Sequence, residues 1–126
     1  MKVIYKNPKI VAEIGCNHKG DMNIAKELLT IASQCGVTVG KFQKRNNREL
    51  LTHDQYNAPH PNPINAYGES YGDHREFLEF DINQHQELKE FAENLGIIYS
   101  TSVWDITSAY EVTNLNPDFI KVPSAC

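Results

Sequence analysis

The sequence has no long hydrophobic run, no cluster of basic residues and few cysteines. Its apolar stretches are too short to span a membrane, and the N-terminus lacks the apolar core and cleavage site of a signal peptide. No run of Lys or Arg offers a surface for nucleic acid, and the net charge is only −4. Cys16, Cys35 and Cys126 are odd in number and have no CxxC spacing, as is typical of free thiols. We therefore expect a cytoplasmic protein with no nucleic-acid or membrane partner.

Several short motifs of enzyme sites are also missing. The chain has no Walker loop and no GxGxxG, and nothing in it is similar to a nucleophile elbow. The histidines are scattered, and none has metal-ligand spacing with another, so we assign no metal ligand. His18 follows Asn17 in a predicted turn, where a hydrogen bond to the backbone is a simpler interpretation than ligand binding.

The hydrophobic pattern alternates between short strands and amphipathic helices. Its 126 residues suffice for one globular domain. Apolar periodicity and turn residues predict strands at 9–14, 37–43, 97–103 and 119–124, and helices at 22–34, 83–94 and 107–114. A long loop is expected at 45–79. Strands alternating with helices indicate an α/β fold of parallel βα units, either a doubly wound open sheet or a (β/α)₈ barrel.

Polar side chains follow the predicted strands at their carboxyl ends. Glu13 ends the first strand, and Lys41 and Gln43 share one face of the second because strand side chains alternate. The third strand ends in "STS" and the fourth in "KVPS". In α/β folds these strand ends meet at the functional site. Ammonium and hydroxyl groups there favour an anionic substrate such as a phosphate or carboxylate, although each residue alone is also typical of a solvated rim.

Five motifs follow one another between residues 9 and 126: "IVAEIGCNHKG", "KFQKRN", "YGDHREFLEF", "STSVWD" and "FIKVPSAC". Together they resemble the sialic acid synthase family, which includes N-acetylneuraminate synthase and its legionaminate and pseudaminate relatives. "AEIG-NH-G" followed by "KFQ" is the most specific part. The resemblance implies a (β/α)₈ TIM barrel. It also implies a carbohydrate-biosynthesis transferase that condenses phosphoenolpyruvate with an N-acetylated amino sugar, such as N-acetylmannosamine or a diacetamido-hexose, and releases phosphate.

The resemblance implies residue roles that agree with the placement above. Glu13 matches an active-site glutamate that assists the steps at the enol ether carbon, and Gln43 matches a contact to the acceptor sugar. The positions that hold phosphoenolpyruvate match Lys41, Thr101, Lys121 and Ser124. The resemblance also implies a homodimer and a divalent metal, Mn²⁺ or Mg²⁺, whose histidine ligands come from later strands. Where many members read "SGE" after the lysine of the fourth strand, this chain has Ser-Ala-Cys.

The length bears on the activity that we expect. A complete barrel takes roughly 250 residues, so residues 1–126 correspond to the first half of one, with four strands and about three helices. We expect a partial domain that stops after the fourth strand, lacks the family's C-terminal antifreeze-like domain and is inactive by itself.

Two other functions stay open: a non-catalytic, anion-binding half-barrel module, and another phosphoenolpyruvate-condensing synthase that makes 3-deoxy sugar acids. The 45–79 segment is either a lid or sugar contact, or an ordinary surface excursion. Its candidate contact residues are Tyr56, Tyr67, Tyr71, His74 and Arg75.

Overall fold

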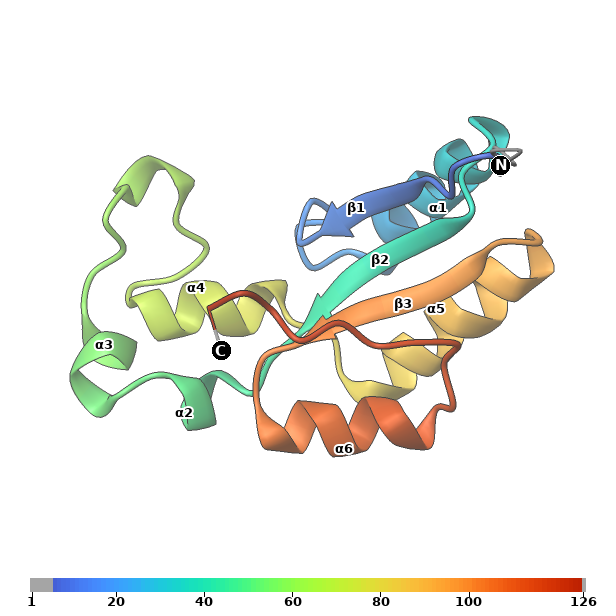
Figure 1. Cartoon of the computed structure of the whole chain (residues 1–126). Helices are drawn as coiled ribbons and strands as arrows, with labels where there is room; N and C mark the ends of the chain where they lie inside the picture. Colours follow the sequence, from blue (N-terminus) through green and yellow to red (C-terminus); the bar gives the residue numbers. More distant parts are fainter. Residues whose placement is uncertain (1–5, 126) are drawn as a thin grey trace.

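The computed structural model describes residues 6–125, and its elements alternate between parallel strands and helices (Figure 1). The strands are β1 (Val11–Gly15), β2 (Val39–Lys44) and β3 (Ile98–Val103). The longer helices are α1 (Met22–Gln34), α5 (Ile82–Asn94) and α6 (Ile106–Asn114). These bounds lie within two residues of the predicted ones, and the α/β class with parallel βα units is confirmed. Cys126 lies outside the described residues.

Within residues 6–125, the sheet has three strands in the order β1-β2-β3 rather than the four predicted. Residues 119–124 run beside β3 (Figure 1) but form only an isolated parallel bridge between Lys121 and Ser102. Two hydrogen bonds make this bridge, from Lys121 N to Thr101 O and from Val103 N to Lys121 O, each 3.0 Å long. Pro123 has no N–H to continue the ladder. The prediction of a fourth strand was therefore wrong at the level of hydrogen bonding, although its position beside β3 was right.

The register of the sheet decides which side chains share a face. Glu13 pairs with Lys41, which pairs with Ser100 on β3. A register shift between Glu13 and Gly15 leaves Ile14 as an extra residue of β1. Ile14 therefore turns to the opposite face from Glu13, where it joins the core.

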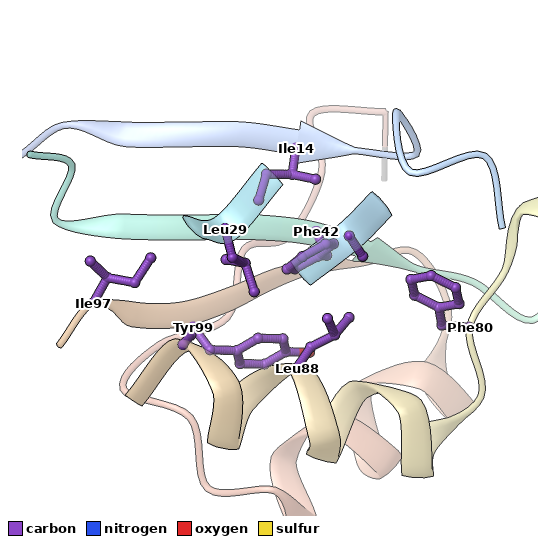
Figure 2. Packing of buried hydrophobic residues seen from close by; sticks show 9 residues of the cluster. Ile14, Leu29, Phe42, Phe80, Leu88, Ile97 and Tyr99 are labelled. Carbon is purple, nitrogen blue, oxygen red and sulfur yellow. The ribbon is translucent and has the colours of Figure 1, made fainter. Parts of the chain in front are cut away.

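The hydrophobic core lies between the sheet and helices α1 and α5. Figure 2 shows Ile14, Phe42 and Tyr99 from the three strands directed toward Leu29 of α1 and Leu88 of α5. Both helices begin at an aspartate whose side chain accepts backbone N–H groups of the first turn. None of the helices within residues 6–125 is long and apolar enough to cross a membrane.

The segment between β2 and α5 is mostly helical, so the prediction of a loop at 45–79 was wrong. It holds α2 (Asn47–Leu50), α3 (His53–Asn57), the 3₁₀ turn η1 (Pro63–Asn65) and α4 (Tyr71–Leu78). Capping boxes at Thr52 and Ser70 begin α3 and α4. Figure 1 shows these helices beyond the carboxyl end of β2. Short helices of this kind carry too few turns to show an apolar period in the sequence.

Candidate functional site

An ion pair between β1 and β2 is the centre of the candidate site. Lys41 Nζ donates to Glu13 Oε2 at 2.5 Å and to Ser102 Oγ at 3.4 Å. The Lys41 side chain is 6% exposed, whereas that of Glu13 is 64% exposed. Because Glu13 and Lys41 pair in register, both point to the sheet face opposite the core, which we call the polar face. A buried ammonium group is thus held at a fixed place with one carboxylate open to solvent.

A second row of polar residues lies next along the polar face. Gln43 pairs with Ser102, and Ser102 bridges to Lys121. Partners in register share a face, so Gln43, Ser102 and Lys121 lie one step beyond the Glu13–Lys41 row. Lys121 is exposed, and Gln43 is half-buried. The structure therefore brings together four of the six residues singled out in the sequence: Glu13, Lys41, Gln43 and Lys121.

The two remaining residues are placed differently. Thr101 is fully buried and alternates with Ser100 and Ser102, so its side chain lies on the core face with Tyr99. The hydroxyl beside Lys41 belongs to Ser102 instead. Ser124 is exposed in the turn that follows the Lys121 bridge. Their roles in substrate binding stay predictions, and the structure adds Ser102 as a candidate.

Two arginines and a cysteine form a cluster next to Gln43 that the sequence interpretation missed. Cys16 Sγ lies 3.7 Å from Gln43 Oε1, 3.7 Å from Arg75 Nη2 and 3.8 Å from Arg45 Nη1. Glu79 Oε1 lies 2.7 Å from Arg75 Nη2 and 3.6 Å from Arg45 Nη1. Glu79 Oε2 accepts the backbone N–H of Arg45 at 3.1 Å. One carboxylate is therefore shared by two guanidinium groups.

Burial and neighbouring charges shift the pKa values of Glu79 and Arg75 in this cluster. Burial raises the pKa of Glu79, and Arg75 and Arg45 offset only part of that effect. Burial works to lower the pKa of Arg75, but contacts with Cys16 and Glu79 outweigh it and raise that pKa. The sequence signal for the cluster was faint: Arg45 directly follows β2, and Arg75 and Glu79 have the i,i+4 spacing of a helical ion pair.

The histidines near the site are buried and neutral. His18 stacks on Phe80 at 4.0 Å, and its Nδ1 accepts the N–H of Gly20, which confirms the predicted backbone bond. Burial lowers the pKa of His18 to about 4, and Arg75 adds to the effect. His85 lies in the core, where burial lowers its pKa to about 3. Among residues 6–125, no three His, Cys, Asp or Glu side chains are placed together to hold a metal ion.

Comparisons with known proteins agree on one family. Human N-acetylneuraminate-9-phosphate synthase is 38% identical over 91% of this chain and 32% of its own length. N,N'-diacetyllegionaminic acid synthase of Campylobacter jejuni is 32% identical over 94% of the chain and 36% of its own length. The crystal structure of N-acetylneuraminic acid synthetase from Leptospira borgpetersenii, in complex with citrate, superposes with a TM-score of 0.71 at 24% identity. The superposed region covers 92% of this chain and 36% of the Leptospira chain, and this similarity shows that the two share a fold.

The chain spans about a third of the length of these relatives. The family profile that matches covers residues 28–126, which include the second row of the polar face and both arginines of the cluster. By this match over most of the sequence, the chain belongs to the NeuB family.

Proposed function

We propose that this sequence forms the phosphoenolpyruvate-binding edge of a transferase that makes a sialic-type acid. The enzyme would condense phosphoenolpyruvate with an N-acetylated amino sugar and release phosphate. The observation that carries the proposal is the fixed Lys41 ammonium on the polar face, with Glu13, Ser102, Gln43 and Lys121 around it. The names of the relatives support the sialic-type product and leave the acceptor open: one product carries a 9-phosphate and the other is a diacetylated legionaminic acid.

The chemistry of the condensation suits these side chains. Carbon 3 of phosphoenolpyruvate attacks the aldehyde carbon of the sugar, positive charge develops at carbon 2, water adds there, and phosphate leaves. Lys41 and Lys121 would neutralise the substrate anion, and the Ser102 hydroxyl would fix its orientation. Glu13 would stabilise the charge at carbon 2 or orient the water. Gln43 would contact the acceptor at the outer end of the row.

Glu13 also favours a catalyst over a simple anion-binding module. Its carboxylate lies directly on the Lys41 ammonium and removes positive charge that a binder of anions would need. In a reaction that passes through a cationic carbon, the same carboxylate would stabilise the positive charge on that carbon. The geometry therefore does not support the alternative function, a non-catalytic module that only binds anions.

The complete enzyme requires more than these residues supply. We expect a divalent metal, Mn²⁺ or Mg²⁺, to activate the sugar aldehyde in the complete protein. Among residues 6–125, no group of His, Cys, Asp or Glu side chains is placed to hold such an ion. We also expect a homodimer, and we expect residues 1–126 alone to be inactive, because they span about a third of the length of the relatives.

The proposal is tested by phosphate release in the native protein that carries this sequence. We expect release to require both phosphoenolpyruvate and an N-acetylated amino sugar. Lys41→Met should lower kcat/KM for phosphoenolpyruvate at least about tenfold, because it removes a charged hydrogen-bond donor. Lys44→Met is the matched control, since Lys44 is also a buried lysine of β2 but pairs with Glu111 of α6. Equal losses in both variants would contradict the proposal.

A further inference from the structure

Cys16 lies between the polar face and the two arginines of the cluster, and the function proposed above assigns nothing to its side chain. Its sulfur contacts three polar groups: Gln43 Oε1 at 3.7 Å, Arg75 Nη2 at 3.7 Å and Arg45 Nη1 at 3.8 Å. Gln43 is the residue that we expect to meet the acceptor sugar. The contacts of Cys16 therefore concern the acceptor side of the proposed site.

The turn between β1 and α1 holds the backbone of Cys16 in place. Asn17 Nδ2 donates to the carbonyl of Ile14 at 2.9 Å, and the N–H of Lys19 donates to the carbonyl of Cys16 at 3.1 Å. The neighbouring His18 is 2% exposed. The Cys16 side chain itself is half-buried, so it is fixed by the turn and still open to small reagents.

The donors and acceptors around the sulfur have one consistent arrangement. A thiol donates one hydrogen and accepts through its sulfur, whereas a guanidinium group only donates. Arg45 and Arg75 therefore donate to Sγ, and the thiol hydrogen points to the one acceptor among the three partners, Gln43 Oε1. If the Gln43 amide were turned over, its NH₂ group would face the thiol, and the thiol hydrogen would lose this acceptor. Cys16 thus selects which end of the amide faces the cluster.

This arrangement places the amide nitrogen of Gln43 on the side of β1. Nε2 lies beside Gly15, which has no side chain to cover it, and a Cβ added there would be 3.7 Å from Nε2. Gln43 is half-buried, so its outer end can meet a ligand. An amide nitrogen only donates, and it therefore selects a ligand oxygen that accepts a hydrogen bond. The carbonyl oxygen of an N-acetyl group and the oxygen of a sugar hydroxyl both have this property.

We propose that Cys16 is a positioning residue for the acceptor sugar: its S–H group holds the Gln43 amide so that Nε2 donates to an oxygen of the sugar. This inference rests on the proposed function, in which Gln43 contacts the acceptor. A thiol is a weak donor, so its contribution lies in the orientation of Gln43 and hence in the affinity for the acceptor. The binding of phosphoenolpyruvate at Lys41 does not depend on it.

The kinetic test compares Cys16→Ala with Cys16→Ser in the native protein, with N-acetylmannosamine and its 6-phosphate each offered as the acceptor. Cys16→Ala should raise the KM for the acceptor about three- to tenfold and change kcat and the KM for phosphoenolpyruvate less than about twofold, because one orienting hydrogen bond is lost. Serine keeps a hydroxyl donor, so Cys16→Ser should bring the acceptor KM back to within about twofold of the wild type. Cys35→Ala is the matched control, since Cys35 is exposed at the end of α1, and it should change none of these values.

Three kinetic results would overturn the inference. They are an unchanged acceptor KM in Cys16→Ala, rises of the same size in the alanine and serine variants, and an equal rise of the KM for phosphoenolpyruvate.

Alkylation by iodoacetamide gives a binding signal that does not require turnover. Trypsin places Cys16 in the peptide 10–19 and Cys35 in the peptide 27–41, so mass spectrometry follows the two thiols separately. We expect a saturating acceptor to slow the labelling of Cys16 at least about threefold and to leave that of Cys35 unchanged. Protection of Cys16 without product would uphold the place of the sugar beside Cys16 and contradict the proposed function. Product with unchanged labelling of Cys16 would do the reverse, and no protection with no product would contradict both.

Discussion

At the scale of single residues, the strand register explains why a glutamate lies within the apolar first strand. The register pairs Glu13 with Lys41, so the carboxylate meets the ammonium on the polar face while Ile14 beside it enters the core. Strand alternation alone predicted that Lys41 and Gln43 share a face, and the structure confirms it. Alternation also separates Thr101 from Ser102, a distinction that motif matching does not make.

Buried histidines make the stability of the protein depend on pH. The pKa of His85 is about 3 in the folded protein, mainly through burial and further through Lys44 and His18, whereas Asp81 opposes the shift. The unfolded chain, with an ordinary histidine pKa near 6.5, binds the proton first as the pH falls. The free energy of unfolding should therefore decrease as the pH falls from about 6.5 towards 3.

We expect the His85→Gln variant to lose about 2 kcal/mol less unfolding free energy than the wild type between pH 7 and pH 5. Glutamine stays neutral and can still accept from the Tyr99 hydroxyl, which lies 2.7 Å from His85 Nδ1. Urea unfolding of both proteins at the two pH values measures the difference. The same pH dependence in both would show that His85 is not held neutral by burial.

At the scale of elements, the turn before α1 and helix α4 are fitted closely together. Gly20 has a φ of +73°, and a Cβ at this position would collide with the backbone carbonyl of Phe77 in α4. Gly36 follows α1 with a similar φ of +78°, but a Cβ there would meet nothing within 4 Å. Substitutions at Gly20 and at Gly36, when compared, separate the effect of backbone conformation from the effect of close packing.

Alanine at either glycine should lower the free energy of unfolding by about 1–2 kcal/mol, because an L-residue is strained at this φ. Gly20→Ala should lose roughly a further 1–3 kcal/mol, since the carbonyl of Phe77 has to move. Chemical denaturation of the two variants makes the comparison. Losses of the same size would mean that α4 does not lie against the turn.

The elements also show what the sequence could and could not predict. Helices α1, α5 and α6 carry aspartate caps and several turns of apolar periodicity, and their predicted bounds differ from the observed ones by at most one residue. Residues 45–79 lack that signal because each helix there is short and held by caps and tertiary contacts. The arginine cluster was missed for the same reason: Arg45 and Arg75 are 30 positions apart and meet only once α4 folds back on the strand end.

At the scale of the whole molecule, side-chain contacts connect the polar face with the arginine cluster. They run from the Glu13–Lys41 pair past Gln43 to Cys16 and Arg75. Strand alternation let the sequence predict the first part of this row at the strand ends. The position of Arg75 depends on how the segment between β2 and α5 folds, which the sequence did not predict.

The most direct measurement follows the new carbon–carbon bond itself. Phosphoenolpyruvate labelled with ¹³C at carbon 3 is incubated with an N-acetylated amino sugar and the native protein, and the label is followed by NMR. We expect the vinyl signal of carbon 3 to become the methylene signal of a nine-carbon 2-keto acid, and to stay unchanged with Lys41→Met. Release of labelled pyruvate instead, or the same methylene product in the Lys41 variant, would contradict a synthase site built on this lysine.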